Sequence, residues 1–332
     1  MNILVDYHHD SLLTSLYMLF EGRLGHTLYR PAGMRWFHEG FWKINDQIDT
    51  AQQFLAEAPP KDGTRTIHNT DHRTITYDEF LDTDFGLIIA SVPQHIQPFE
   101  KLARMKHCPF AMQVGNNWDL GLLAGHNILA SVKSVYGPHM TNVCYYRQEF
   151  DTNIFCRPDE EPSELRVSSY VNCLSEWPVG WTDFLRMEKD VTEKWNGYGD
   201  VTFRSFGGQC RDGNMNGPHE LAGSMQKDTM VFHVKDYGDG YGHVVHNALA
   251  CGRPIIYRGR FTKGTMIGDL LNENNSFDLD EGYWEDNVAN IIHALGDSYA
   301  LKSMSEQAYK SFKANVDFAD DARRVGEWLQ TL

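Results

Sequence analysis

The alternation of short apolar runs with helical segments is the feature that most constrains the fold of this 332-residue chain. The chain begins with the strand-like run "NILVDY", continues through a segment with leucines at helical spacing, and reaches a second strand-like run, "HTLYR". Further along, "FGLIIAS" and "PFAMQV" are separated by the helical segment "HIQPFEKLARMK". Strands that alternate with helices in this way indicate a parallel sheet with helices packed on its faces.

The same alternation restarts in the second half, after the acidic, proline-containing stretch "DTNIFCRPDEEPSE", which is typical of an interdomain link. We therefore expect an α/β protein with two doubly wound Rossmann-like domains that face each other across a cleft. The expected domains are residues 1–160 and 161–310. One closing helix is expected over residues 304–332, because an apolar side recurs along it, and its last part, 311–332, is expected to pack back on the first domain.

Charge and composition exclude several classes of protein. The formal net charge is −15, so the surface as a whole repels nucleic acid and anionic membranes. The N-terminus has no basic region, and no apolar run approaches the ~20 residues of a membrane helix, so we expect a cytoplasmic protein with no membrane span. The six cysteines form no CxxC pair and the histidines show no metal-ligand spacing, so neither disulfides nor a metal site is expected.

The stretch "DYGDGYGHVVHNALACGRPIIY", residues 236–257, places glycines between the strand-like "TMVFHV" and a helical segment. The N–H groups and dipole of a helix N-terminus favour phosphate or sugar oxygens, and glycines let such a ligand approach the backbone. The residues alone leave a second interpretation open, in which the glycines only satisfy a tight turn with positive φ.

The same stretch resembles the sugar-nucleotide signature of GT-B glycosyltransferases, in which an acid, Gly-aromatic-Gly and a second acid precede a run like "ALACGRPII". The second half of the chain is similar to that of the retaining GT-B families. The resemblance implies that Asp239 contacts the donor sugar and that Asn247 stands where a second acid holds the ribose hydroxyls. Asn247 is an amide, which still hydrogen-bonds a diol but carries no charge.

The resemblance extends to a donor site for a nucleotide sugar, with a UDP-sugar as the expected co-substrate and no cofactor or metal. Many family members neutralise the diphosphate with an Arg and a Lys that are missing here, so Arg204 and Lys235 are candidate substitutes, and the backbone at Gly207 and Gly208 is a candidate phosphate cradle. The remaining implied donor contacts are Gly240, Tyr241 by stacking, Gly242 and His243.

Transfer to a hydroxyl with inversion needs a base that accepts the proton of the acceptor. The candidates are His8 and His9 after the first strand and Asp119 after a later strand. Each has a plainer interpretation as a residue that caps or fills a turn.

The expected function is therefore a glycosyltransferase that moves a sugar to a hydroxyl acceptor. The segment from Glu21 to Asp46 is similar to bacteriophage glycosyltransferases, which suggests a hydroxymethylated pyrimidine of phage DNA as acceptor. Because the net charge is negative, this acceptor requires a cleft that concentrates the basic residues Arg35, Lys43, Lys101, Arg104, Lys106 and Lys133. Two alternatives stay open: a catalytically inactive sugar-nucleotide or nucleic-acid binding module of the same fold, and a nucleotide-sugar epimerase.

Overall fold

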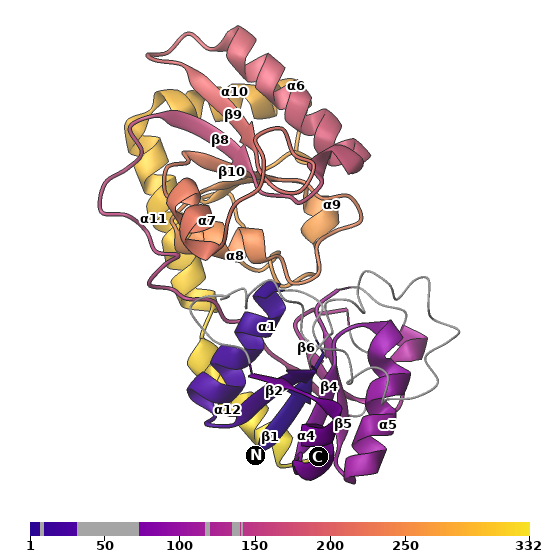
Figure 1. Ribbon diagram of the computed structural model, residues 1–332. Coiled ribbons are helices and arrows are strands. Elements are labelled where there is room, and N and C mark those ends of the chain that lie inside the picture. Colours follow the sequence, from indigo (N-terminus) through magenta and orange to yellow (C-terminus); the bar gives the residue numbers. More distant parts are fainter. Residues whose placement is uncertain (7–9, 32–72, 117–119, 135–139, 141) are drawn as a thin grey trace. The chain divides into compact units, whose positions relative to one another are not determined.

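The computed structural model describes residues 1–6, 10–31, 73–116, 120–134, 140 and 142–332 (Figure 1). Its elements form two compact units. Unit 1 takes residues 1–150 together with 318–332, and unit 2 takes residues 151–317. The chain therefore passes between units at residues 150/151 and 317/318, where the sequence had suggested 160/161 and 310/311.

In its described residues, unit 1 holds a seven-stranded parallel sheet in the order β3-β2-β1-β4-β5-β6-β7. The strands are β1 (Asn2–Val5), β2 (Thr27–Pro31), β3 (Arg73–Ile75), β4 (Leu87–Ala90), β5 (Phe110–Val114), β6 (Asn127–Ala130) and β7 (Asn142–Tyr145). Because the chain adds β2 and β3 on one side of β1 and then returns to add β4 on the other, the sheet is doubly wound.

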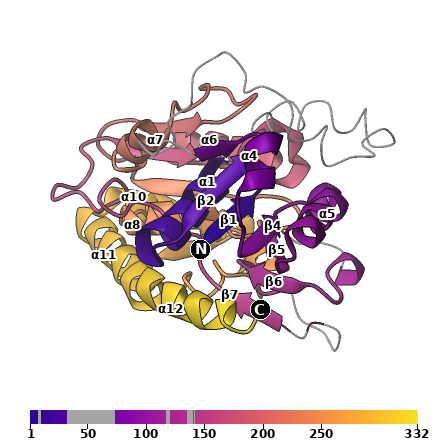
Figure 2. The same ribbon diagram turned by 60° about the horizontal axis from the view of Figure 1, so that its bottom comes forward.

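Helices cover both faces of this sheet. They are α1 (Asp10–Tyr17), which continues as a π-helical segment over Met18–Arg23, α4 (Tyr77–Asp82), α5 (Ile96–Lys106) and α12 (Phe318–Leu329). On one face, Leu16 of α1 and Trp328 of α12 are buried with Ile3 of β1. On the other face, Phe99 of α5 is buried with Ile88 of β4. Figure 2 shows α12 and α5 on opposite sides of the strands.

Unit 2, in which every residue is described, has a five-stranded parallel sheet in the order β12-β11-β10-β8-β9. The strands are β8 (Leu165–Ser169), β9 (Val201–Ser205), β10 (Met230–His233), β11 (Ile255–Tyr257) and β12 (Ser276–Asp278). The helices are α6 (Pro178–Lys194), α7 (Pro218–Met225), α8 (His243–Ala250), α9 (Gly259–Thr262), α10 (Trp284–Gly296) and α11 (Ser298–Asn315). Phe184 of α6 and Ile291 of α10 are buried with Phe232 of β10 in one core.

The closing segment is two helices, so the prediction of one helix over residues 304–332 is wrong. Helix α11 ends at Asn315, and Val316 is extended, with φ −115° and ψ 109°. Helix α12 then begins at Phe318 and belongs to unit 1. Because the apolar sides of α11 and α12 are buried in different units, the backbone between them leaves the helical conformation.

Candidate functional site

The crevice where a doubly wound sheet usually binds its ligand lies, in unit 2, between the carboxyl ends of β8 and β10. Strand β8 pairs with β9 on one side and with β10 on the other, so the order of the strands reverses at this point. Ligands of such sheets bind outside the carboxyl ends of the strands at the point of reversal. The loop after β10, residues 234–242, begins there and contains the glycine-rich stretch.

Asp239 is the acidic residue of this loop, and two basic side chains hold it. Its Oδ1 accepts a hydrogen bond from Lys235 Nζ at 2.9 Å, and its Oδ2 lies 3.4 Å from His233 Nε2. Burial raises the pKa of Asp239, but the hydrogen bonds and charges of His233 and Lys235 outweigh burial and hold the pKa well below its usual range. Asp239 is therefore an ionised, largely buried carboxylate at the crevice.

The loop reaches helix α8 through two glycines that its backbone requires. Gly238 has φ +88°, and a Cβ there would lie 2.8 Å from the carbonyl oxygen of Phe261. Gly242, the N-cap of α8, has φ +81°, and a Cβ there would lie 2.4 Å from Ile267 Cγ2. The tight-turn interpretation thus holds for both glycines. The N-cap residue of α8 is Gly242, which has no side chain to accept from the first amides of the helix, and helix N-termini favour anions.

Asn247 lies on α8 with only 6% of its surface exposed. Its Oδ1 has no hydrogen-bond partner among the described residues. A buried polar atom without a partner carries a desolvation cost, and such atoms in a crevice often meet a ligand or water. Asn247 Oδ1 is therefore a buried acceptor that no described residue satisfies.

Tyr241 lies in the core of unit 2. Its ring is 2% exposed, stacks on His246 with centroids 4.2 Å apart, and meets the ring of His243 edge-on at 4.9 Å. The ring is thus not placed to stack on a sugar, although stacking is what the sequence suggested. Tyr241, which stands between Gly240 and Gly242, instead packs the turn against α8.

The groups expected to hold the diphosphate are engaged within the chain. Arg204 Nη1 lies 2.8 Å from Asp212 Oδ1. The amide of Gly207 donates to the carbonyl of Gly213 at 2.8 Å, and the amide of Gly208 donates to Asn172 Oδ1 at 2.6 Å. These two amides stabilise their own loop, so the proposed phosphate cradle at Gly207 and Gly208 is not available in this conformation.

A second helix start at the same edge is already occupied by a carboxylate that the sequence analysis missed. Asp236 accepts hydrogen bonds from the amides of Val179 and Gly180 at the start of α6, each at 2.9 Å. A Cβ on Gly180 would lie 2.4 Å from the carbonyl oxygen of Val234, so α6 packs directly on the end of β10. The amides of Val179 and Gly180 at the start of α6 are therefore already bonded to the Asp236 carboxylate.

The three predicted base candidates, His8, His9 and Asp119, lie outside the described residues, as do Arg35 and Lys43. At the carboxyl edge of the unit 1 sheet the structure instead shows a cluster that the sequence analysis missed, formed by Asp6 after β1 and by Ser91 and His95 after β4. Asp6 accepts from Ser91 Oγ at 2.5 Å, and its Oδ2 lies 2.6 Å from His95 Nδ1. All three are buried, and the polar residues that follow the buried run "LIIA" were the available signal.

The described part of the chain shows neither a metal-binding cluster nor a membrane-spanning helix. No group of three or more His, Cys, Asp and Glu side chains there is arranged to hold a metal ion. None of its helices is long and apolar enough to cross a membrane.

Comparison with known proteins shows the fold. No protein-family model and no curated protein matches the sequence. Among solved structures, HepE of Anabaena in complex with UDP-glucose is similar over 100% of both chains, with a TM-score of 0.67 and 14% identity. Sucrose-phosphate synthase from Thermosynechococcus elongatus covers 100% of this chain at a TM-score of 0.61 and 11% identity, with 98% of its own chain matched.

A third structure, the lipopolysaccharide outer core galactosyltransferase WaaB, matches 100% of this chain and 99% of its own at a TM-score of 0.56 and 9% identity. At these identities the likeness establishes the fold alone. The chain therefore has the fold of GT-B glycosyltransferases, with two parallel-sheet α/β domains, as the sequence predicted.

Proposed function

We propose that the protein is a glycosyltransferase whose unit 2 binds a UDP-sugar between the carboxyl ends of β8 and β10. The observation that carries the proposal is the ionised Asp239 carboxylate beside the glycine N-cap of α8, a helix on which the Asn247 amide oxygen has no partner among the described residues. A negative acceptor for sugar hydroxyls thus adjoins a helix start suited to phosphate. HepE, a protein of the same fold, is described in complex with UDP-glucose and with UDP and glucose.

The proposed roles follow from the geometry. Asp239 accepts hydrogen bonds from hydroxyls of the donor sugar, and the first turn of α8, from Gly242 and His243, faces the diphosphate. Lys235 forms an ion pair with Asp239 in the unliganded protein and is the cation proposed to meet the departing diphosphate. Asn247 accepts a hydrogen bond from a ribose hydroxyl. Arg204 already forms an ion pair with Asp212, so it contacts the donor phosphate only after that ion pair breaks.

In the proposed reaction the bond between the sugar C1 and the diphosphate oxygen breaks, and the diphosphate leaves with the electron pair. The acceptor oxygen forms the new bond to C1, and its proton passes to a base. His8, His9 and Asp119 remain the proposed bases. Stabilisation of the leaving charge by the α8 dipole and Lys235, without a metal, is also part of the proposal.

The acceptor is proposed to be a hydroxyl, with a hydroxymethylated pyrimidine of phage DNA as the specific candidate. The net charge of −15 weighs against duplex DNA, so the test compares acceptors directly. Nucleotide release from UDP-glucose is followed with hydroxymethylated DNA, with unmodified DNA and with no acceptor. Release that only the modified DNA stimulates supports this acceptor, and equal release with both DNAs rejects it.

Binding of the donor is tested by thermal unfolding with UDP-glucose. A ligand at a hundred times its Kd stabilises the folded state by about 2.7 kcal/mol, so the melting temperature rises. We expect Asp239→Asn to remove the rise, and Asp286→Asn, at an exposed position in the same unit, to keep it. No rise with any sugar nucleotide in the unmodified protein would contradict the proposal.

The Asn247→Leu variant is expected to weaken UDP-glucose binding without lowering the stability of the unliganded protein. Because Oδ1 of Asn247 has no partner, an apolar side chain of similar size is expected to leave the melting temperature unchanged or higher without ligand. The same variant is expected to bind UDP-glucose about tenfold more weakly, since it loses one hydrogen bond. Binding without turnover in the unmodified protein would favour the inactive binding module, and free UDP release with no glycoside would favour the epimerase.

A further inference from the structure

A second cavity lies at the amino edge of the unit 2 sheet, opposite the edge that carries Asp239. Its volume is about 310 Å³, and its lining includes Ser163 before β8, Tyr198 before β9 and Arg253 before β11. Because these residues precede their strands, while Asp239 follows β10, the cavity is separate from the proposed donor site. Leu165, Leu295 and Leu301 supply an apolar part of its wall.

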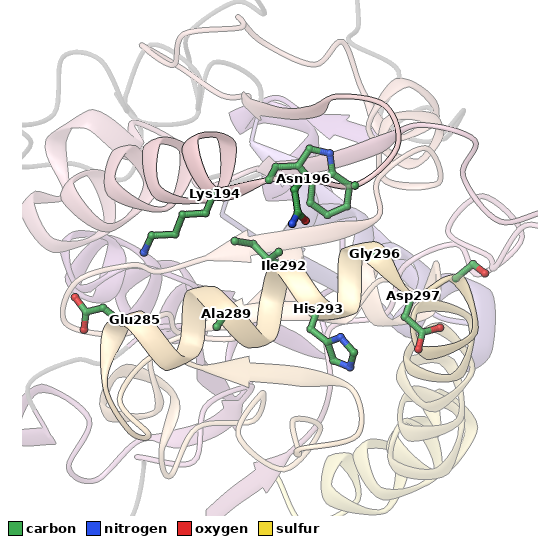
Figure 3. A pocket seen from close by; sticks show the side chains of 11 residues that line it. Lys194, Asn196, Glu285, Ala289, Ile292, His293, Gly296 and Asp297 are labelled. Atoms are coloured by element: carbon green, nitrogen blue, oxygen red, sulfur yellow. The ribbon is translucent and has the colours of Figure 1, made fainter.

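An open pocket of about 810 Å³ adjoins this cavity and shares Trp195, Gly197, Gly296 and Ser298 with it. Figure 3 shows Lys194 and Asn196 on one side of the pocket, and Ala289, Ile292 and His293 of α10 on the other. The open pocket gives the inner cavity a wide approach from the surface.

Trp195 is a fixed wall between the two spaces. Its indole Nε1 donates to the carbonyl of Gly199 at 2.8 Å. A Cβ on Gly197 would lie 2.3 Å from the indole ring, and a Cβ on Gly296 would lie 3.9 Å from it. The loop after α6 therefore closes tightly on the ring, which presents a rigid aromatic surface.

Arg253 brings a buried positive charge to the inner cavity. The residue is 1% exposed. Its Nε donates to the carbonyl of Cys251 at 3.0 Å, and its Nη1 donates to the carbonyl of Asp228 at 3.1 Å. Its Nη2 has no hydrogen-bond partner among the described residues. Burial lowers the pKa of Arg253, although nearby Glu161 opposes that shift. Unused donors on a buried guanidinium carry a cost that a bound acceptor removes.

The Glu161 carboxylate, which Arg253 contacts, is bound more closely by another arginine. Glu161 Oε1 lies 2.5 Å from Arg157 Nη2 and accepts from Ser305 Oγ at 3.2 Å, whereas Glu161 Oε2 is 3.4 Å from Arg253 Nη1. Glu306 Oε1 lies 4.0 Å from Arg157 Nη2, and the Glu306 side chain is the more exposed of the two. Two guanidinium groups thus contact the Glu161 carboxylate, and the contact with Arg253 is the longer and weaker of the two.

We propose that this cavity binds a small organic monoanion, a carboxylate on an apolar or aromatic body. The carboxylate accepts from Nη1 and Nη2 of Arg253, in the bidentate geometry that a guanidinium favours, while Glu161 stays with Arg157. The body of the ligand packs against Trp195 and the three leucines. The carboxylate of the ligand supplies the acceptor that Arg253 Nη2 lacks among the described residues, and a pocket of this volume suits a ligand of modest size.

The probe is benzoate, with benzamide as its neutral counterpart of the same shape. Both are added to the full chain at matched ionic strength, and binding is measured by calorimetric titration and by the shift in melting temperature. Three variants are compared. Arg253→Met removes the guanidinium, Ser163→Trp fills the mouth of the cavity from an exposed position, and Arg260→Met removes an exposed arginine elsewhere in unit 2.

We expect benzoate to bind the unmodified protein and Arg260→Met equally, and benzamide to bind at least tenfold more weakly. Both Arg253→Met and Ser163→Trp should lose benzoate binding. Since Arg253→Met also loses two structural hydrogen bonds, Ser163→Trp provides the independent test if that variant does not fold. The proposal is overturned if benzamide binds as well as benzoate, if Ser163→Trp binds unchanged, or if the unmodified protein binds no benzoate.

Discussion

At the scale of single residues, the buried charges of unit 2 divide into those that need a partner from outside and those that the fold already satisfies. Arg253 belongs to the first kind, because its Nη2 has no partner among the described residues, whereas Asp239 already contacts Lys235 and His233. Asp228 belongs to the second kind. Its carboxylate accepts from Arg166 Nε at 2.6 Å, from Ser168 Oγ at 2.6 Å and from the Tyr170 hydroxyl at 2.5 Å.

Asp228 gives a prediction for the pH dependence of stability. Burial raises its pKa to about 6, against the opposing charge of Arg166. The folded state therefore binds a proton more tightly than the unfolded state, and the free energy of unfolding should fall as pH rises from about 4 to about 6. Asp228→Asn should remove this component of the slope, and exposed Asp200→Asn should keep it. Urea unfolding of the three proteins between pH 4 and 7 measures the slope, and identical slopes would contradict the assignment.

At the scale of elements, the starts of the helices decide where a ligand can bind. The first amides of α6 donate to the carboxylate of Asp236 and those of α11 to that of Asp297, whereas the N-cap residue of α8 is Gly242, which has no side chain. The sequence showed the last of these, because glycines next to an apolar helical stripe are a local signal. It did not show Asp236 as the partner of α6, because 56 residues separate it from Gly180 and only the parallel sheet brings them together.

The two capped helices allow a matched prediction. Asp236 uses Oδ2 for the amide of Val179 and Oδ1 for that of Gly180, so Asp236→Asn should lose one of the two bonds. Asp297 uses Oδ1 for the amides of both Tyr299 and Ala300, so Asp297→Asn should keep both. We expect a loss of about 1–2 kcal/mol for Asp236→Asn and a few tenths for Asp297→Asn. Thermal unfolding measures both, and a larger loss at Asp297 would contradict this account.

At the scale of the whole molecule, the architecture follows from patterns that are local in sequence, whereas contacts between residues far apart in the sequence do not. Alternating strands and helices were sufficient to predict two doubly wound sheets, because the alternation is visible within each half of the sequence. The break at Val316 was missed because the apolar periodicity continues through it, and only burial in two separate units explains it. The Asp6, Ser91 and His95 cluster was missed for the same reason as Asp236, since it forms only when β1 and β4 pair.

Separate cores predict separate effects of core substitutions. Trp328 of α12 is buried in unit 1 with Leu16, so Trp328→Ala should destabilise unit 1 by about 3–5 kcal/mol. Trp284 of α10 packs against the unit 2 core and donates to Asp190 at 2.7 Å, so Trp284→Ala should destabilise unit 2 instead. In scanning calorimetry with UDP-glucose, we expect Trp328→Ala to lower a transition that does not respond to the ligand, and Trp284→Ala to lower the one that does. If both variants lower one common transition equally, the two units unfold as a single cooperative body.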